Sequence, residues 1–150
     1  MKSKEDNGPY NIHAEAEITV EFYDLDPLRI VWHGNYLNYF EAGRRALLEK
    51  ISYSYEEMEK SGYAFPVIEV YAKYLNSLRL NDRALVKAIL MEYENRLLIR
   101  YEIRNARTGV LTTKGSSTQM AFDIKSNDSC FVCPPILISK VEAFIGENKQ

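Results

Sequence analysis

The sequence predicts an α+β domain in which one long helix packs against an antiparallel sheet. Several segments alternate apolar and polar residues with the period of two that is typical of a strand with one buried face. Only one long segment, residues 35–50, has the spacing of an amphipathic helix. The strands follow one another through short turns, which favours antiparallel pairing. With 150 residues, the chain is about one domain long.

The composition is that of an ordinary globular domain, with 46% hydrophobic and 27% charged residues. A net charge of -2 and a pI near 5.8 give no basic surface for nucleic acid. The sequence has no run of 18 apolar residues to span a membrane, and residues 1–8 are too polar for a secretory signal. We therefore expect a cytoplasmic location.

The first strand follows a polar N-terminal arm, residues 1–13. Residues 14–23 alternate apolar and polar side chains and run directly into Asp24. Pro27 disfavours helix at the residue before it, so a loop begins here. The helix of residues 35–50 follows, and its apolar face is formed by Tyr36, Phe40, Gly43, Leu47 and Ile51.

Two details of the helices can be predicted. Gly43 costs about 1 kcal/mol relative to alanine in a helix, so we expect it where the helix closely approaches the sheet. Asn35 is the predicted N-cap of the long helix. A second, short helix is expected at residues 53–60, with Ser54 as its N-cap.

Four extended segments complete the predicted sheet, and a terminal helix led by two prolines is expected at residues 134–146. Residues 105–109 form a hairpin turn with a glycine that can adopt positive φ. The last strand is expected to be broken or bulged near Gly115. The four strands are predicted at residues 64–75, 84–93, 96–104 and 110–124.

The two cysteines, Cys130 and Cys133, form a lone C-x-x-C. A structural zinc site would need four ligands, and no second pair completes one. Redox chemistry is the alternative, but the βαβ context typical of thioredoxin-like motifs is absent. The favoured interpretation is that both are small apolar residues of the core.

Residues 24–41 contain the side chains from which an active site can be built. Asp26 lies at the edge of an apolar run that includes Trp32, where a carboxylate can act as general base or nucleophile. Asp24 is the rival candidate, and both aspartates could instead cap the loop. His33 could bind a substrate carbonyl or shuttle a proton, or be merely a cap or a packed side chain.

The backbone N–H groups of residues 33–36 lie at the predicted helix start, where the helix dipole favours developing negative charge. Other kinds of site lack support. The sequence contains no G-x-S-x-G, H-E-x-x-H, P-loop or G-x-G-x-x-G motif, so nothing in it indicates a nucleophilic triad, a metal site or a nucleotide site.

The stretch Asp-Leu-Asp-Pro-Leu-Arg-Ile-Val-Trp-His-Gly-Asn-Tyr-Leu-Asn-Tyr-Phe-Glu, residues 24–41, strongly resembles the motif of the hot-dog fold thioesterases. The resemblance is to the 4-hydroxybenzoyl-CoA thioesterase and YbgC-like group. That pattern has a strand, D-x-D, an apolar pair, an aromatic residue, often His, and N-Y or S-Y opening the central helix. The similarity covers about residues 14–125 and implies an antiparallel sheet of about five strands wrapped around the central helix.

The resemblance also implies an activity, hydrolysis of an acyl-CoA thioester without a metal or cofactor. It makes Asp26 the catalytic carboxylate, as nucleophile or general base, and His33 the residue whose backbone N–H polarises the thioester carbonyl. Two subunits of such proteins pair their sheets into a homodimer with active sites at the interface, and dimers often pair again into tetramers. The implied substrate-binding residues at the helix start are Trp32, Gly34, Asn35 and Tyr36.

The sequence departs from the family pattern at two places. Many members have a glycine after the catalytic aspartate, whereas this loop reads Leu28-Arg29. Arg29 could meet a CoA phosphate or simply be solvated. Several YbgC-like members have a tyrosine where this chain has Phe22, which argues against a tyrosine-assisted mechanism.

One alternative belongs to a different functional class. A non-catalytic hot-dog dimer would bind acyl-CoA or an acyl-carrier protein without turnover. The presence of Asp26 and His33 argues against it, because a binding protein needs no base. A hot-dog dehydratase would require a different arrangement of His and carboxylate, which the sequence does not contain.

Overall fold

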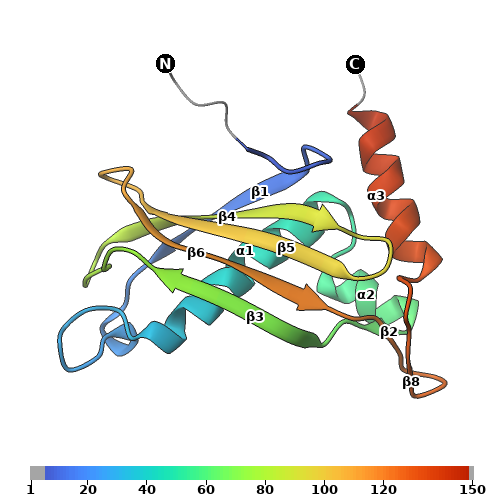
Figure 1. Cartoon of the computed structure of the whole chain (residues 1–150), viewed down its shortest axis with the longest axis horizontal. Coiled ribbons are helices and arrows are strands. Elements are labelled where there is room, and N and C mark those ends of the chain that lie inside the picture. The colour runs from blue at the N-terminus through green and yellow to red at the C-terminus, as the bar shows by residue number, and fades with distance from the viewer. Residues whose placement is uncertain (1–5, 149–150) are drawn as a thin grey trace.

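The computed structural model describes residues 6–148, in which a curved sheet lies against one long helix (Figure 1). None of the helices in this part of the chain has the length and apolar character needed to cross a membrane. The elements in chain order are β1 (His13–Thr19), the 3-10 turns η1 (Phe22–Asp24) and η2 (His33–Asn35), α1 (Tyr36–Lys50), α2 (Tyr55–Ser61), β2 (Tyr63–Ala64), β3 (Val67–Tyr74), β4 (Arg83–Glu92), β5 (Leu97–Asn105), β6 (Leu111–Gln119), β7 (Phe122–Asp123), β8 (Asp128–Ser129) and α3 (Pro135–Glu147).

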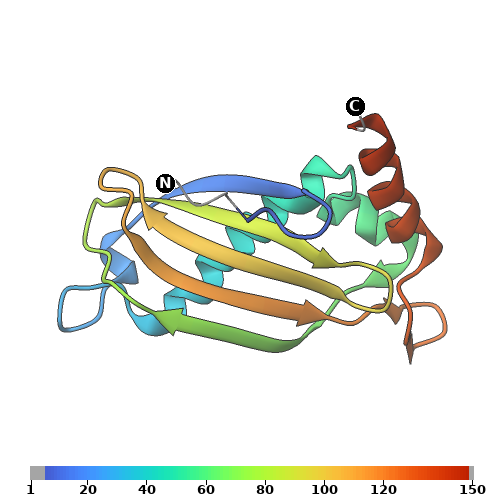
Figure 2. The ribbon, with the colours of Figure 1, turned by 45° about the horizontal axis from the view of Figure 1, so that its top comes forward.

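The main sheet has five antiparallel strands in the order β1-β4-β5-β6-β3. The helix α1 crosses one face of this sheet, and the strands curve around it (Figure 2). A small sheet of β2, β7 and β8 lies beside α2 and α3. The predicted α+β class, with about five strands around a central helix, is confirmed.

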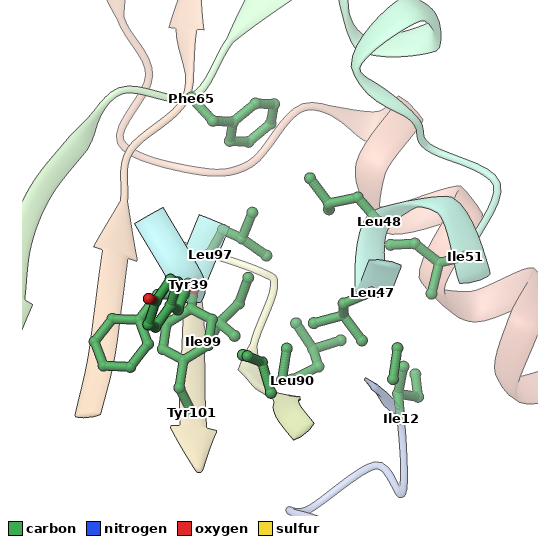
Figure 3. Packing of buried hydrophobic residues seen from close by; sticks show 14 of the residues in the cluster. Ile12, Tyr39, Leu47, Leu48, Ile51, Phe65, Leu90, Leu97, Ile99 and Tyr101 are labelled. Atoms are coloured by element: carbon green, nitrogen blue, oxygen red, sulfur yellow. The ribbon is translucent and has the colours of Figure 1, made fainter. Parts of the chain in front are cut away.

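The apolar face predicted for α1 is the face that the sheet covers. All five of its predicted members are buried. The Phe40 ring stacks on Tyr101 of β5, with ring centroids 4.5 Å apart. A Cβ atom on Gly43 would lie 2.8 Å from a methyl carbon of Val86, so the predicted close approach of helix and sheet is also confirmed. Figure 3 shows Leu47 among the sheet and N-terminal side chains that fill this interface.

The first strand is shorter than predicted. Thr19 pairs with Arg83, the first residue of β4. Val20 still bonds to the turn before β4, donating to Asp82 at 2.8 Å and accepting from Asn81 at 3.1 Å, and the chain then leaves the sheet. It turns through η1 instead. Phe22, which the alternation placed on the buried face, is 78% exposed.

The predicted break in the last strand is wrong. β6 runs without a register shift through Gly115, which pairs with Tyr101 on one side and Ala72 on the other. The glycine is needed for another reason. A Cβ atom there would lie 2.2 Å from the carbonyl oxygen of Tyr71 and 2.7 Å from the Phe40 ring. Gly115 therefore allows α1 and β3 to approach β6 closely.

The short helix α2 begins at Tyr55, two residues later than predicted. Its N-cap is Ser54, as predicted, because the Ser54 hydroxyl accepts a hydrogen bond from the Glu57 N–H at 3.2 Å. Gly62 ends the helix with a φ of 83°, a left-handed conformation that glycine adopts without steric cost.

Residues 6–12 of the predicted polar arm lie along the sheet, and residues 1–5 lie outside the described residues. Leu90 of β4 donates its N–H to the carbonyl of Ile12 at 2.9 Å, and Ile12 is buried. Tyr10 packs edge-on against Tyr93, with ring centroids 5.0 Å apart. This segment therefore extends the contacts of β1 along β4.

Both cysteines are free, and Cys133 is buried in the core. Burial raises the pKa of the Cys133 thiol to about 11, so the thiol is protonated at neutral pH. Cys130 is half-buried and packs against the same core. These surroundings favour the interpretation of both residues as apolar core residues.

Replacing Gly115 should destabilise the fold because its Cβ would overlap a backbone oxygen. We expect Gly115→Ala to lower the free energy of unfolding by about 3 kcal/mol. The matched control is Gly146→Ala, where nothing beyond the adjoining residues and backbone of its own helix lies within 4 Å of the added Cβ. Its effect should stay within about 1 kcal/mol. Urea unfolding followed by circular dichroism checks both values, and equal stabilities would contradict the explanation.

Candidate active site

Asp24 is held in place by hydrogen bonds. Its side chain is buried, and its Oδ2 accepts hydrogen bonds from the Glu21 N–H at 2.9 Å and the Tyr39 hydroxyl at 3.0 Å. Its carbonyl oxygen accepts from the Trp32 N–H at 2.9 Å and from Asn35 Nδ2 at 2.8 Å. Burial and the neighbouring Asp24 carboxylate raise the pKa of Tyr39, which keeps the phenol protonated as a donor. The geometry of Asp24 is that of a structural anchor.

Asp26, two residues later, has a different environment. Its Oδ1 accepts hydrogen bonds from the N–H groups of Leu28 at 2.8 Å and Ile30 at 3.5 Å. Its backbone carbonyl accepts from the Arg29 N–H at 2.9 Å, which closes a tight loop. Within the described residues, Oδ2 has no hydrogen-bond partner. The loop-capping interpretation therefore holds for one carboxylate oxygen, and the other remains free for chemistry.

A cavity of about 280 Å³ opens beside Asp26, between the start of α1 and the end of β3. These segments meet at one end of the sheet, on the left in Figure 1. Three of the predicted site residues share this cavity. Its walls are formed by Asp26, Ile30, Val31, His33, Tyr36, Tyr74, Leu75, Asn76 and Ser77.

Aromatic contacts join the two sides of the cavity. The Tyr74 hydroxyl donates a hydrogen bond to the carbonyl of His33 at 2.9 Å. Tyr74 also lies 5.2 Å from the Tyr36 ring and 6.2 Å from the His33 imidazole, measured between centroids. Tyr36 is buried, and burial raises the pKa of its phenol. The end of β3 is thus fixed to the start of the helix.

The remaining predicted site residues, Trp32, Gly34 and Asn35, come just before the start of α1. Trp32 is 49% exposed, and its indole covers Gly34 so closely that a Cβ atom on Gly34 would lie 2.3 Å from the ring. Asn35 occupies the N-cap position of α1, as predicted, but its side chain makes no cap hydrogen bond and donates to the Asp24 carbonyl instead. The 3-10 turn η2, which includes both Gly34 and Asn35, leads directly into α1.

Sequence reasoning missed the wall formed by residues 74–77. The turn-forming composition of residues 76–82 predicted a loop there, but no local signal placed that loop beside Asp26. Among the described residues, no group of three or more His, Cys, Asp or Glu side chains is arranged to hold a metal ion. The chemical groups that the cavity offers are therefore a carboxylate, an imidazole, a helix start and phenols.

Residues 20–143 match the family model of the thioesterase-like superfamily. The chain belongs to this superfamily. The match includes the whole candidate site and four of the five strands of the main sheet. It confirms the predicted resemblance to hot-dog thioesterases and the assignment to thioester hydrolases, whereas membership of the narrower YbgC-like group stays a prediction.

Proteins similar to this chain agree with this assignment. YneP of Bacillus subtilis, provisionally named an acyl-CoA thioesterase, is 32% identical over 75% of this chain and 82% of its own length. A DHNA-CoA thioesterase structure from Staphylococcus aureus has a TM-score of 0.76 at 28% identity, covering 92% of this chain and 96% of that one. ATL3 of Arabidopsis thaliana, an acyl-acyl carrier protein thioesterase, is 38% identical over 49% of this chain but only 39% of its own length.

The anchoring role of Asp24 can be tested by stability. We expect Asp24→Ala to lower the free energy of unfolding by about 3 kcal/mol, because it leaves buried donors without their charged acceptor. The exposed Asp128 of β8 provides the control, since Asp128→Ala should change stability by about 0.5 kcal/mol or less. Urea titrations measure both, and an Asp24→Ala protein as stable as the control would exclude the anchor.

Proposed function

We propose that this chain is an acyl-CoA thioesterase that hydrolyses the thioester to a free acid and CoA. The observation that carries the proposal is the carboxylate of Asp26. One of its oxygens is fixed by the loop, and the other has no partner within the described residues beside a cavity at a helix start. A carboxylate held in this way is positioned to attack an acyl carbon or to activate water.

The proposed reaction begins with the thioester carbonyl oxygen at the start of the helix. The backbone N–H of His33 donates to this oxygen and stabilises the negative charge that develops there. As a general base, Asp26 takes a proton from water while the hydroxide forms a bond to the carbonyl carbon. The tetrahedral intermediate then collapses, the carbon–sulfur bond breaks, and the CoA thiolate takes the proton from Asp26, which restores the carboxylate.

In the nucleophilic variant, Oδ2 of Asp26 bonds to the carbonyl carbon and CoA leaves as the thiolate. Water then hydrolyses the acyl–Asp26 anhydride, which restores the carboxylate and releases the acid. Both forms of the mechanism use the Asp26 carboxylate and the backbone N–H of His33. Tyr36 and the start of the helix lie beneath the acyl group, and Trp32, Gly34 and Asn35 complete the substrate-binding segment.

The relatives support a CoA thioester as the substrate class. YneP carries an acyl-CoA thioesterase name, and the Staphylococcus aureus neighbour is a DHNA-CoA thioesterase. The ATL3 name adds acyl-carrier protein as an alternative carrier of the thioester. The CoA assignment is favoured because this chain covers 82% of YneP and 96% of the DHNA-CoA thioesterase, but only 39% of ATL3.

We also propose that the protein works as a homodimer joined through β3. This strand is at the edge of the sheet, and its apolar side chains Val67, Ile68, Val70, Tyr71 and Tyr74 are each about half-exposed. A long apolar edge strand left in water invites pairing with a second strand. Because Tyr74 also lines the cavity, such pairing would bring a second subunit to the site. Pairing of two dimers into a tetramer would follow the family pattern.

The catalytic role of Asp26 can be tested by Asp26→Asn, which keeps the Oδ1 acceptor of the loop and removes the charge. We expect kcat to fall by about 1000-fold with little change in KM. Thiol release from a panel of short-chain, long-chain and aromatic acyl-CoAs measures this, with unfolding curves to show that the variant is folded. Full activity in Asp26→Asn would refute the assignment. If the wild-type protein binds acyl-CoA but does not hydrolyse it, the chain is a binding protein instead.

The proposed dimer can be tested by Tyr71→Glu. A twofold interface contains each residue twice, so the substitution places two like charges near one another. We expect the dimer dissociation constant to rise by at least about tenfold, measured by sedimentation velocity. The control is Phe131→Glu, because Phe131 is an exposed aromatic residue outside the main sheet. A Tyr71→Glu protein that remains as dimeric as the control would contradict pairing through β3.

A further inference from the structure

A second cavity, of about 550 Å³, shares Asp26 with the first cavity but is not lined by Tyr74. It lies between the loop after β1 and the loop after β3, and its wall includes Phe22, Arg29, Arg79 and Leu80. Asp26 lines both this cavity and the smaller one described above. A ligand bound with its reacting atoms at Asp26 could therefore extend in two directions.

Two arginine side chains give the second cavity its charge. Neither Arg29 nor Arg79 forms an ion pair within the described residues, whereas Arg83 nearby is paired with Glu17 at 3.3 Å. The neighbouring carboxylates in the sequence accept hydrogen bonds from backbone N–H groups: Asp26 from its own loop, and Asp82 from the Arg79 N–H at 2.8 Å. The guanidinium groups are thus available to an anionic ligand.

The backbone of Arg29 gives an independent reason to assign it a function. Its φ is 63°, in the left-handed region that disfavours side chains with a Cβ atom. Glycine would adopt this conformation without strain. A strained residue kept beside a functional carboxylate suggests that its side chain is used.

We propose that this second cavity binds the diphosphate of CoA, with Arg29 and Arg79 as the phosphate ligands. The inference rests on the proposed thioesterase function and divides the substrate at Asp26. The acyl group enters the cavity lined by Tyr36 and Tyr74, the thioester sulfur stays beside Asp26, and the pantetheine arm leads the diphosphate to the two arginines. Guanidinium groups suit phosphate oxygens because they donate paired hydrogen bonds. Phe22 and Leu80 offer an apolar wall to the uncharged parts of CoA.

The experiment compares one acyl group on two carriers, CoA and pantetheine, since pantetheine lacks the diphosphate together with the rest of the nucleotide. The measured quantity is the ratio of kcat/KM for acyl-CoA to kcat/KM for acyl-pantetheine. Arg29→Gly removes the charge and relieves the strained φ, so a folding defect is not expected. We expect Arg29→Gly and Arg79→Ala each to lower the ratio about tenfold, and the double variant about 100-fold.

The matched control is Arg96→Ala, at the opposite end of the sheet in the β4–β5 connection, where Arg96 pairs with Glu92. Its ratio should equal that of the wild type. Calorimetric titration with free CoA measures the dissociation constant directly. This constant should rise in the cavity variants by the same factors by which the ratio falls. Ratios unchanged by both cavity substitutions would overturn this inference alone, whereas a wild-type protein that hydrolyses no thioester would overturn the proposed function.

Discussion

Four hydrogen bonds that converge on Asp24 hold together the end of the sheet, the loop and the helix. Its carboxylate joins Glu21 to Tyr39, and its carbonyl joins Trp32 to Asn35. A buried charge is tolerated only when such partners are in place, so the arrangement has little freedom to change. The position of Asp26, two residues farther along the chain, depends on this anchor.

The elements of the fold that depend on burial could be predicted from the sequence. The apolar face of α1 was predicted because a helix buries residues at a spacing fixed by its own geometry. The end of β1 could not be predicted in this way. Because β1 and β4 are antiparallel, the last residue of β1 lies opposite the first residue of β4, some 60 residues later in the chain. The start of β4 therefore sets the end of β1. The role of Gly115 was missed for the same reason, since the atoms that crowd it belong to β3 and α1.

The candidate site shows the same division. The motif selected Asp26 and His33, and the structure places both on one cavity. The opposite wall, which includes Tyr74, follows from the position of β3 in the sheet, which no local pattern encodes. Asn35 occupies the N-cap position, but its Nδ2 donates to the Asp24 carbonyl and its Oδ1 accepts from Asn38 Nδ2 at 3.3 Å, so the expected cap bond to the helix backbone does not form.

The wall of the cavity opposite Asp26 is supported separately from Asp24. Leu75 and Asn76 donate their N–H groups to Thr112 at 2.8 and 3.0 Å, and the Asn76 amide donates to Leu111 at 2.8 Å, so β6 holds this loop. Side chains at residues 75–77 can therefore vary while backbone bonds, including that from the Val31 N–H to the Leu78 carbonyl at 2.9 Å, keep the wall and the loop of the carboxylate together. Over evolutionary time, such a division would let descendants of one ancestor diverge in acyl preference while the hydrolytic chemistry is inherited unchanged.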